Sequence, residues 1–203
     1  MSLAENLIEN GWLKTFNIIK AFKKIKREDF IPDDIKNLAE WDEALPIGFG
    51  QTISQPLTVA FMLELLQPKL EDKVLDVGAG SGWTTAILAE VVNEKGNVVA
   101  IEVIPELAEF GKNNVAKYGF KNVEYVCSDG SKGFKKLAPY DKILVSAATE
   151  NVSDAQFWKE QLKIGGRLVC VIQNSIWLFI KQSEDEFQEK EYPGFVFVPL
   201  IKP

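Results

Sequence analysis

One stretch of the chain decides the fold: Asp76-Val77-Gly78-Ala79-Gly80-Ser81-Gly82-Trp83. It follows the apolar run Val74-Leu75 and precedes a segment with helical spacing, Thr84 to Val92. Glycines at a strand-to-helix turn let the backbone bend sharply and let a ligand approach the main chain. The stretch therefore predicts a βα unit whose turn is suited to binding a ligand.

Short apolar runs and longer segments with helical spacing alternate through the rest of the chain, which predicts βαβ crossovers and a mostly parallel, doubly wound α/β sheet. Two further strand-like runs, Ser175 to Lys181 and Phe195 to Leu200, have no helix between them, only the charged stretch Gln182 to Glu191. They predict an antiparallel hairpin at one edge. The predicted strands of the parallel part are Val74-Leu75, Val98-Ile101, Val123-Cys127, Ile143-Val145 and Leu168-Ile172, and the helices include Pro105 to Tyr118.

The N-terminal part has a different pattern, which predicts a helical cap. From Ala4 to Lys24 the apolar residues recur at spacings of three and four, as on the buried face of one amphipathic helix. Asp33 to Gln51 reads as a short helical turn followed by a loop with Pro and Gly. We expect residues 1–56 to form the cap and residues 57–203 the core of one structural unit. The apolar stripe consists of Ile8, Trp12, Phe16, Ile19 and Phe22.

Composition excludes several kinds of chemistry. The 203 residues are 46% hydrophobic and 26% charged, as in a soluble globular domain. Lys and Arg number 23 against 29 Asp and Glu, a net charge of −6 that argues against binding nucleic acid through its phosphates. The chain contains no histidine, which excludes Ser-His-Asp and Cys-His nucleophiles, histidine-ligated metals and a histidine general base.

The location of the protein is predicted from its cysteines and its N-terminus. Cys127 and Cys170 are far apart and each lies in an apolar run, so we expect two core thiols in a reducing compartment. The charged N-terminal stretch is unlike a signal peptide, and no segment is apolar enough to span a bilayer. We expect a cytoplasmic protein that binds no membrane, and a monomer is favoured.

The glycine pattern indicates which ligand the turn would hold. A dinucleotide fingerprint, G-x-G-x-x-G, would place its third glycine at position 83, where this chain has Trp83. The observed D-x-G-x-G-x-G resembles the S-adenosylmethionine loop of Rossmann-like methyltransferases. That cofactor has no phosphates but carries an ammonium and a sulfonium, which the carboxylate of Asp76 can attract. The alternative is a tight turn that binds nothing.

Two more acids are predicted at neighbouring strand ends. Glu102 ends the next strand, where an acid can accept hydrogen bonds from a ribose diol. Asp129-Gly130 ends the third, where an acid and a backbone N–H can bind the edge of an adenine. Each acid also has a structural explanation, a helix N-terminus for Glu102 and an Asx turn for Asp129. Together with Asp76 they meet at the carboxyl edge of the sheet, which favours a ligand site.

Several motifs together resemble the protein-L-isoaspartate O-methyltransferase family, from about Arg27 to the C-terminus. The block Leu45-Pro46-Ile47-Gly48-Phe49-Gly50-Gln51-Thr52-Ile53-Ser54-Gln55-Pro56 is specific to that family. The other motifs are Arg27-Glu28-Asp29-Phe30-Ile31-Pro32, the Asp76 loop with its strand, Asp129-Gly130-Ser131, Ala138-Pro139-Tyr140-Asp141, Gln161 to Leu168 and Phe197-Val198-Pro199-Leu200.

The resemblance implies an enzyme that transfers a methyl group from S-adenosylmethionine to the free α-carboxylate of an L-isoaspartyl residue in a damaged protein. S-adenosylhomocysteine is the second product, and the methyl ester then closes to a succinimide, which begins repair. The resemblance makes Ser54 the active-site residue and implies no metal. The residues expected to bind the cofactor are Gln51, Thr52, Ile53, Asp76, Gly78, Gly80, Gly82, Glu102, Val103, Asp129 and Gly130.

The absence of histidine is consistent with this reaction. A carboxylic acid with a pKa near ~4 is already an anion at pH 7, so the acceptor needs no general base. The enzyme has to remove water from the carboxylate and aim one oxygen at the methyl carbon. The hydroxyl of Ser54 could orient that oxygen. As an alternative, Ser54 could be the N-cap of the helix that follows Pro56.

The sequence also departs from the family on what we expect to be the acceptor side. Glu150 and Ser153 stand where the family has prolines, and Val171-Ile172-Gln173 replaces a usual Pro-Val-Gly. These changes leave open a methyltransferase with a different acceptor, or a homologue that binds the cofactor without turnover. A nicotinamide oxidoreductase is disfavoured by Trp83 and by the lack of an evident Tyr-x-x-x-Lys pair.

Overall fold

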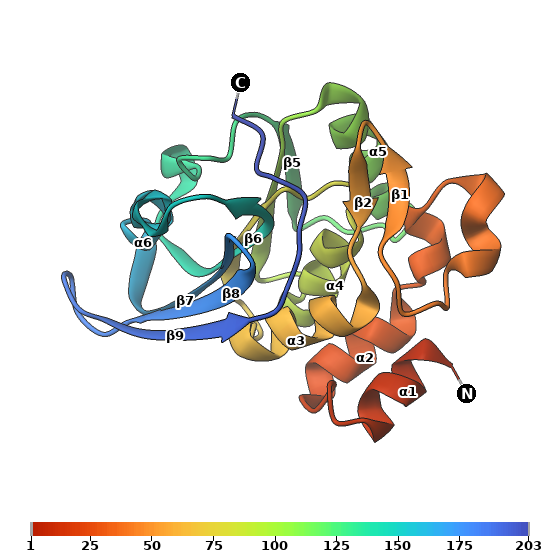
Figure 1. Ribbon diagram of the computed structural model, residues 1–203, viewed down its shortest axis with the longest axis horizontal. Helices are drawn as coiled ribbons and strands as arrows, with labels where there is room; N and C mark the ends of the chain where they lie inside the picture. The colour runs from red at the N-terminus through yellow and green to blue at the C-terminus, as the bar shows by residue number, and fades with distance from the viewer. Residues whose placement is uncertain (1, 203) are drawn as a thin grey trace.

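A seven-stranded sheet forms the centre of the computed structural model, which describes residues 2–202 (Figure 1). The strand order is β5-β4-β3-β6-β7-β8-β9; β5 to β7 are parallel, and β8 and β9 are added antiparallel at one edge. This confirms the predicted α/β fold with a C-terminal hairpin. The strands are β3 (Lys73–Val77), β4 (Asn97–Glu102), β5 (Val123–Cys127), β6 (Tyr140–Thr149), β7 (Leu162–Ile172), β8 (Ser175–Lys181) and β9 (Phe187–Pro193).

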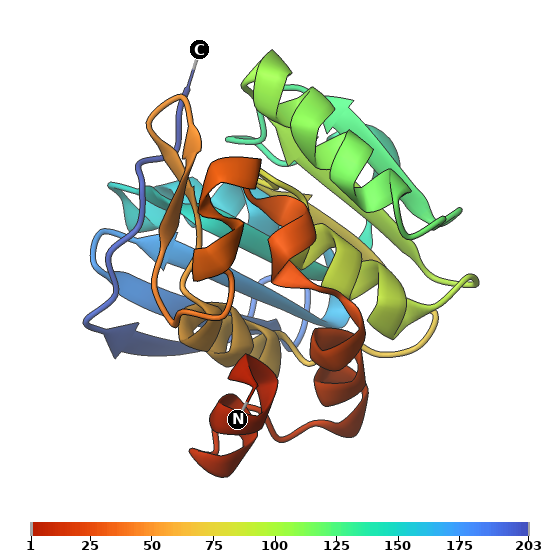
Figure 2. The ribbon, with the colours of Figure 1, turned by 90° about the vertical axis from the view of Figure 1, so that its right-hand side faces the viewer.

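Helices cover both faces of the sheet because the central strands are apolar on both sides. Val74 packs into the core under α1 to α5, and its neighbour Leu75 packs into the core under α6. Figure 2 shows α4 and α5 lying across the first of these faces. The helices are α1 (Leu3–Glu9), α2 (Phe16–Lys24), α3 (Pro56–Leu66), α4 (Trp83–Val92), α5 (Pro105–Ala116), α6 (Ala155–Lys159), and the 3₁₀ turns η1 (Arg27–Phe30), η2 (Asp33–Leu38), η3 (Lys135–Leu137) and η4 (Val152–Asp154).

The N-terminal segment is two helices, not the single helix that was predicted from Ala4 to Lys24. Gly11 breaks it with a φ of 73°, a left-handed conformation that glycine adopts without strain. The break also changes which residues are buried. Phe16 is 77% exposed, whereas Ile18 and Phe22 pack into the core, so the predicted stripe was wrong in part.

A two-stranded hairpin stands where the sequence predicted a loop. It consists of β1 (Leu45–Gly48) and β2 (Gln51–Ile53), which are antiparallel and joined through Phe49 and Gly50. Both turn residues have positive φ. Leu45, Ile47 and Ile53 are buried, so this short hairpin is held by side chains that pack into the main core rather than by its own length.

The C-terminal hairpin exists, but its second strand is β9 (Phe187–Pro193) and not Phe195 to Leu200. β9 is an edge strand whose side chains are mostly exposed and charged, so it has no apolar alternation to reveal it. The run from Phe195 onward instead crosses the carboxyl ends of the parallel strands, with one bridge between Ala148 and Pro199.

Two simpler predictions have different outcomes. Cys170 is buried, as expected, but Cys127 is exposed at the end of β5, so the prediction of two core thiols was wrong for one of them. Within residues 2–202, no helix has both the length and the apolar character needed to cross a membrane.

The topology of the sheet places a crevice beside the glycine loop. From β3 the chain builds β4 and β5 outward on one side and then crosses to β6 on the other side of β3. In open α/β sheets, ligands bind at the carboxyl ends of the strands where this change of direction occurs. Here that position lies between β3, β4 and β6.

Candidate active site

The glycine loop takes a conformation that side chains disfavour. Gly78, Gly80 and Gly82 have φ values of 75°, 52° and 87°. The N–H groups of Gly78 and Ala79 both donate to Ile101 O at 2.9 and 3.1 Å, which ties the loop to the end of β4. The main chain of the loop thereby forms one wall of a pocket that also includes Glu102 and Val103.

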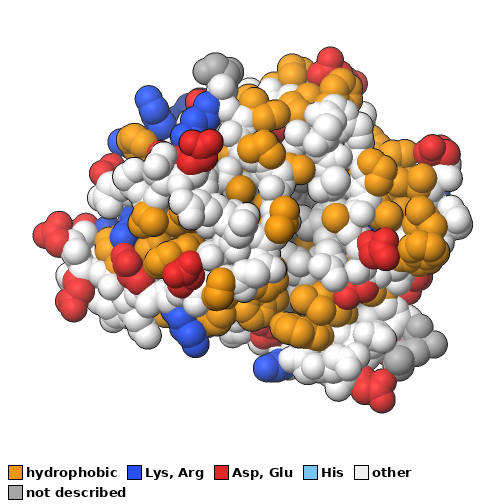
Figure 3. Space-filling view, in the orientation of Figure 1, with side chains coloured by type: hydrophobic (Ala, Val, Ile, Leu, Met, Phe, Trp, Pro, Cys, Tyr) orange, Lys and Arg blue, Asp and Glu red, His pale blue; other side chains and the backbone are white. Residues whose placement is uncertain are grey.

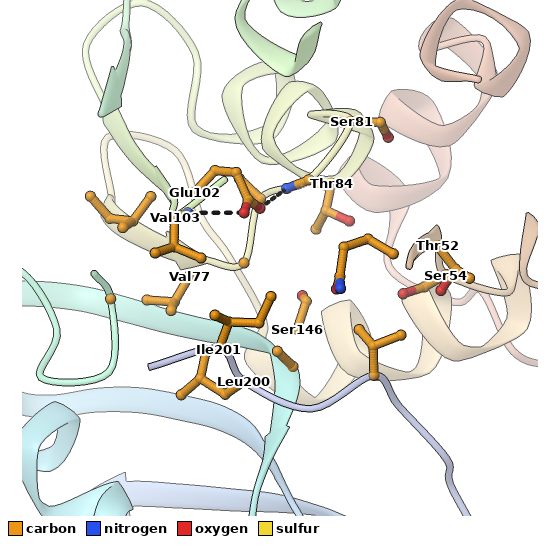
Figure 4. A pocket seen from close by; sticks show the side chains of 18 of the residues that line it. Thr52, Ser54, Val77, Ser81, Thr84, Glu102, Val103, Ser146, Leu200 and Ile201 are labelled. Atoms are coloured by element: carbon orange, nitrogen blue, oxygen red, sulfur yellow. Dashed lines mark hydrogen bonds between the residues drawn. The ribbon is translucent and has the colours of Figure 1, made fainter. Parts of the chain in front are cut away.

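Glu102 lies inside this pocket at the end of β4 and is 6% exposed. One carboxylate oxygen accepts the N–H of Gly80 at 2.8 Å, and the other accepts those of Val103 and Ile104 at 2.9 and 3.1 Å. A carboxylate has about four lone-pair sites, so it still has acceptor capacity for a ligand. Figure 4 shows the fixed carboxylate on one side of the pocket, with Thr52 and Ser54 on the other.

Asp76 is placed differently from the expectation. It is fully buried and does not line the pocket; its Oδ2 accepts the hydroxyl of Thr85 at 2.6 Å, and its Oδ1 has no partner within the described structure. The pKa of Asp76 is raised to about 6, mainly by burial and to a smaller extent by the negative charge of Glu102. Asp76 can therefore act on a bound cation only across the loop, not by direct contact.

Asp129 likewise stays outside the pocket. Its two carboxylate oxygens accept the backbone N–H and the hydroxyl of Ser131 at 2.8 and 3.0 Å, which is the Asx turn that was the structural alternative. Its neighbours Ser128 and Gly130 do line the pocket. The third strand end therefore contributes through Ser128 and Gly130, while the Asp129 side chain shapes the turn.

The hairpin brings Ser54 and its neighbours to the other side of the pocket. Gln51, Thr52, Ile53 and Ser54 all line it. The helix that follows begins at Pro56 with Gln55 as its N-cap. Asp42 Oδ1 accepts the free N–H of Leu57 at 2.8 Å, so Ser54 does not have the capping role considered from the sequence.

A second cavity of about 420 Å³ adjoins the first on the side away from Glu102. The two share Thr52, Ser54, Ser146 and Val198. Its other residues include Gly194 to Phe197, of which Gly194 and Val196 are exposed and the two phenylalanines are half-buried. In the space-filling view, apolar side chains surround the hollow in this face and most charged ones lie toward the periphery (Figure 3).

Residues Val198 to Ile201 are one part of the pocket that was not predicted from the sequence. Val198 to Ile201 form a wall opposite the glycine loop, held by hydrogen bonds from Ala148 N to Val198 O and from Leu200 N to Ala148 O. Gly82, like Asp76 and Asp129, does not line the pocket. The lining residues that were not predicted are Ile47, Val77, Ala79, Ser81, Trp83, Thr84, Ile101, Ser128, Ser146, Ala147, Val198, Pro199, Leu200 and Ile201.

The pocket fits an adenosine-type ligand without phosphates. Glu102 is the one charged residue among the described residues that line it, and neither Lys nor Arg is among them. A dinucleotide would bring phosphates to a site with no cation, whereas a ligand with a ribose diol, an ammonium and a sulfonium matches a single fixed carboxylate. At Gly80, a Cβ would come within 3.4 Å of Ile47 Cδ1 and narrow the space beside the loop.

Comparison with known proteins identifies the family. The sequence model of the protein-L-isoaspartate(D-aspartate) O-methyltransferases matches residues 1–203. The chain belongs to this family. A protein-L-isoaspartate O-methyltransferase of Methanopyrus kandleri is 42% identical over 98% of this chain and 89% of its own length. One from Pyrococcus horikoshii is 43% identical over 97% of this chain and 90% of its own length.

Solved structures of the family have the same fold. One protein-L-isoaspartate O-methyltransferase, 31% identical, superposes with a TM-score of 0.87 over 97% of this chain and 64% of its own. A structure described as a β-aspartate methyltransferase from Plasmodium falciparum in complex with S-adenosyl-L-homocysteine is 22% identical and also gives 0.87, over 99% of this chain and 97% of its own. The second comparison shows the shared fold.

The departures from the family pattern lie outside both cavities. Neither cavity is lined by any residue of Thr149 to Ser153 or Val171 to Gln173. The two segments meet at the ends of β6 and β7, where Gln173 donates its backbone N–H to Thr149 O at 2.7 Å and its side-chain amide to Glu150 O at 3.2 Å. The walls of the two cavities therefore contain none of the substitutions that suggested a different acceptor.

Proposed function

We propose that this protein-L-isoaspartate O-methyltransferase transfers the methyl group at the junction of its two cavities, with Ser54 orienting the acceptor. The enzyme uses S-adenosylmethionine and acts on the α-carboxylate of L-isoaspartyl residues, as the family does. The residues that carry the reaction in this chain are the substance of the proposal. We further infer that it acts as a cytoplasmic monomer, without nucleic acid or membrane. Its acidic net charge supports the part of this inference that concerns nucleic acid.

On the cofactor side, the roles follow from what each wall offers. The carboxylate of Glu102 accepts hydrogen bonds from a ribose diol, and Ile101, Val103 and Leu200 provide apolar surface for a base. Gln51 to Ile53 cover the opposite side. When bound, S-adenosylmethionine supplies an activated methyl group on a sulfonium, so the protein has only to orient and desolvate the reactants.

On the acceptor side, the second cavity contains hydroxyl groups and apolar groups but no charged residue among those described. A carboxylate that enters it arrives already ionised and gives up water to a surface that includes Phe195 and Val198. The hydroxyl of Ser54 donates a hydrogen bond to one oxygen. With that oxygen held in place, a bound S-adenosylmethionine would supply the methyl group to it.

The observation that carries the proposal is the position of Ser54, which lines both cavities. Thr52 and Ser146 do so too, and among these three hydroxyl residues Ser54 is the one that the resemblance to the family makes the active-site residue. A residue that only shaped the cofactor pocket would not also face the second cavity. Its side chain is not used as a cap by the next helix, so the hydroxyl is available to a ligand.

Methyl transfer to a matched pair of peptides tests the proposal. An isoaspartyl peptide and its normal aspartyl twin are incubated with the purified enzyme and S-[methyl-³H]adenosylmethionine, and base-labile radioactivity in the peptide is counted. Labelling of the isoaspartyl peptide alone is expected. Equal labelling of both peptides, or of neither, would contradict the assignment of the second cavity to an isoaspartyl acceptor.

A further inference from the structure

Both main-chain polar groups of Gly80 are hydrogen-bonded, and they belong to the two peptide units on either side of its Cα. Its N–H donates to Glu102 Oε2 at 2.8 Å, as described above, and its carbonyl accepts the hydroxyl of Tyr125 at 2.8 Å. Gly80 lines the cofactor pocket, whereas Tyr125 on β5 does not. Tyr125, which lies outside the pocket, thus holds the carbonyl of Gly80, the residue whose N–H holds Glu102.

Gly111 in α5 is what allows the hydroxyl to reach the loop. A Cβ at this position would lie 2.1 Å from the hydroxyl oxygen of Tyr125 and 2.4 Å from Gly80 O. The ring therefore passes through a gap that exists because residue 111 has no side chain. The fit between the strand, the helix and the loop depends on this pair of residues.

The hydroxyl stays a donor across the range in which the enzyme would work. Burial raises the pKa of Tyr125, and the negative charges of Asp76 and Glu102 raise it further. Because its pKa is raised, the Tyr125 hydroxyl keeps its proton at neutral pH and remains a hydrogen-bond donor. The contact to Gly80 O is therefore permanent rather than a switch.

We propose that Tyr125 is a positioning residue for the cofactor: its hydroxyl holds the Gly80 carbonyl, which limits rotation about the backbone bonds of Gly80 and so keeps the Gly80 N–H on Glu102, in the orientation that receives a ribose diol. This inference rests on the proposed function of the pocket. A glycine has no side chain to limit rotation of its peptide, so a loop made of glycines needs an external contact to keep one orientation. Tyr125 supplies that contact.

The contact acts on one substrate only. Without the hydroxyl, the Gly80 carbonyl is free to turn and the backbone of Gly80 can move its N–H away from Glu102, which weakens binding of the adenosine part. The second cavity is lined by other elements and contains none of Gly80, Glu102 or Tyr125. Loss of the hydroxyl should therefore change cofactor affinity and leave the acceptor unaffected.

Tyr125→Phe tests this with Tyr140→Phe as a matched control. Tyr140 is fully buried and donates its hydroxyl to Phe134 O at 2.8 Å, an equivalent bond at the opposite end of the sheet from the pocket. Titration calorimetry with S-adenosylhomocysteine should show about a three- to tenfold larger Kd for Tyr125→Phe. Tyr140→Phe should stay within twofold, while both variants lose stability to urea.

Kinetics give a second readout. The KM for S-adenosylmethionine should rise in Tyr125→Phe, while kcat/KM for the peptide at saturating cofactor stays the same. Unchanged Kd in Tyr125→Phe, or an equal increase in both variants, would overturn the positioning role, because the effect would then be absent or due to general loosening. If the unmodified enzyme does not bind S-adenosylhomocysteine, the proposed function falls and this inference falls with it.

Discussion

At the scale of single residues, Ser54 is where a structural and a chemical explanation could be separated. The sequence allowed Ser54 to be a helix cap, and the cap is instead the backbone at Gln55. Ser54→Ala should therefore change the free energy of unfolding by less than the ~1 kcal/mol typical of a lost cap. It should lower kcat/KM for an isoaspartyl peptide by roughly 10²-fold, the scale for a reacting group that is misplaced by about 1 Å, with S-adenosylhomocysteine affinity nearly unchanged.

Substitution by aspartate sharpens the same test. Ser54→Asp places a second negative charge beside the acceptor carboxylate, so activity should fall below that of Ser54→Ala. Ser153→Ala is the control, since Ser153 is exposed in η4 and lines neither cavity. Activity of Ser54→Asp equal to that of the unmodified enzyme would remove Ser54 from the reaction.

Asp76 predicts a particular dependence of stability on pH. Its pKa is raised to about 6 in the folded protein, against 3.8 for the ordinary group. Between these values the folded state holds a proton that the unfolded state has lost, so this group's contribution to stability falls as pH rises from about 4 to about 6 and then stays level. A shift of about two pKa units corresponds to roughly 3 kcal/mol.

Asp76→Asn checks this, because the amide has the same shape and no titration. Urea denaturation from pH 4 to pH 7 should show a smaller fall of the unfolding free energy in the variant than in the unmodified protein. Parallel curves for the two proteins would mean that Asp76 titrates alike in both states. Asp34→Asn, at an exposed acid outside the pocket, serves as a control.

At the scale of elements, Arg27 joins the segment that precedes β1 to the residue that follows β2. Its guanidinium is 3% exposed and donates to four backbone carbonyls. Burial lowers the pKa of Arg27 to about 10, so it remains charged at neutral pH. The four acceptors are Ala39 O, Trp41 O, Glu43 O and Ser54 O, at 3.1, 3.0, 2.7 and 3.2 Å.

Arg27→Lys should destabilise the fold by roughly 3 kcal/mol, because an ammonium has three donors on one atom and cannot reach carbonyls arranged around a planar fork. Arg167→Lys is the control, since the Arg167 guanidinium donates to one carbonyl, Leu65 O at 2.8 Å. Urea denaturation of both variants measures the difference. Equal and small losses would show that the four contacts are not a stabilising unit.

The elements that the sequence predicted share one physical property. The central parallel strands β3, β4 and β6 are buried on both faces, and such strands are apolar runs bounded by polar turns. β9 was missed because an edge strand exposed on both sides needs no apolar pattern, and β1 and β2 because strands of four and three residues are too short for one. Gly11 alone was a local signal that was overlooked.

The same reasoning explains how much of the site was predictable. Gly80 and Glu102 were found because parallel topology forces successive strand ends to one edge of the sheet. Topology places a residue but not its side chain, so Asp76 and Asp129 were assigned to the pocket although Asp76 bonds to Thr85 in α4 and Asp129 bonds within its own turn. Val198 lies on a wall formed by a long-range crossing that no local pattern indicates.

For the whole molecule, binding of the cofactor should be visible as thermal stability. A ligand that binds only the folded state at 100 times its Kd adds about 2.7 kcal/mol, or about 5–10 °C in Tm for a chain of this size. S-adenosylhomocysteine should produce this shift in differential scanning fluorimetry. Glu102→Ala should lose about tenfold in affinity and much of the shift, whereas an undiminished shift would remove the ribose assignment.

The wall from Val198 to Ile201 has a consequence for how the enzyme is made. The pocket combines Ser54 with Val198 to Ile201, which are synthesised much later than Ser54. A nascent chain can fold most of its sheet while the pocket still lacks one side. A polypeptide cut short before Val198 would then be folded in large part yet unable to enclose its cofactor, so methylation begins only after translation has passed that point.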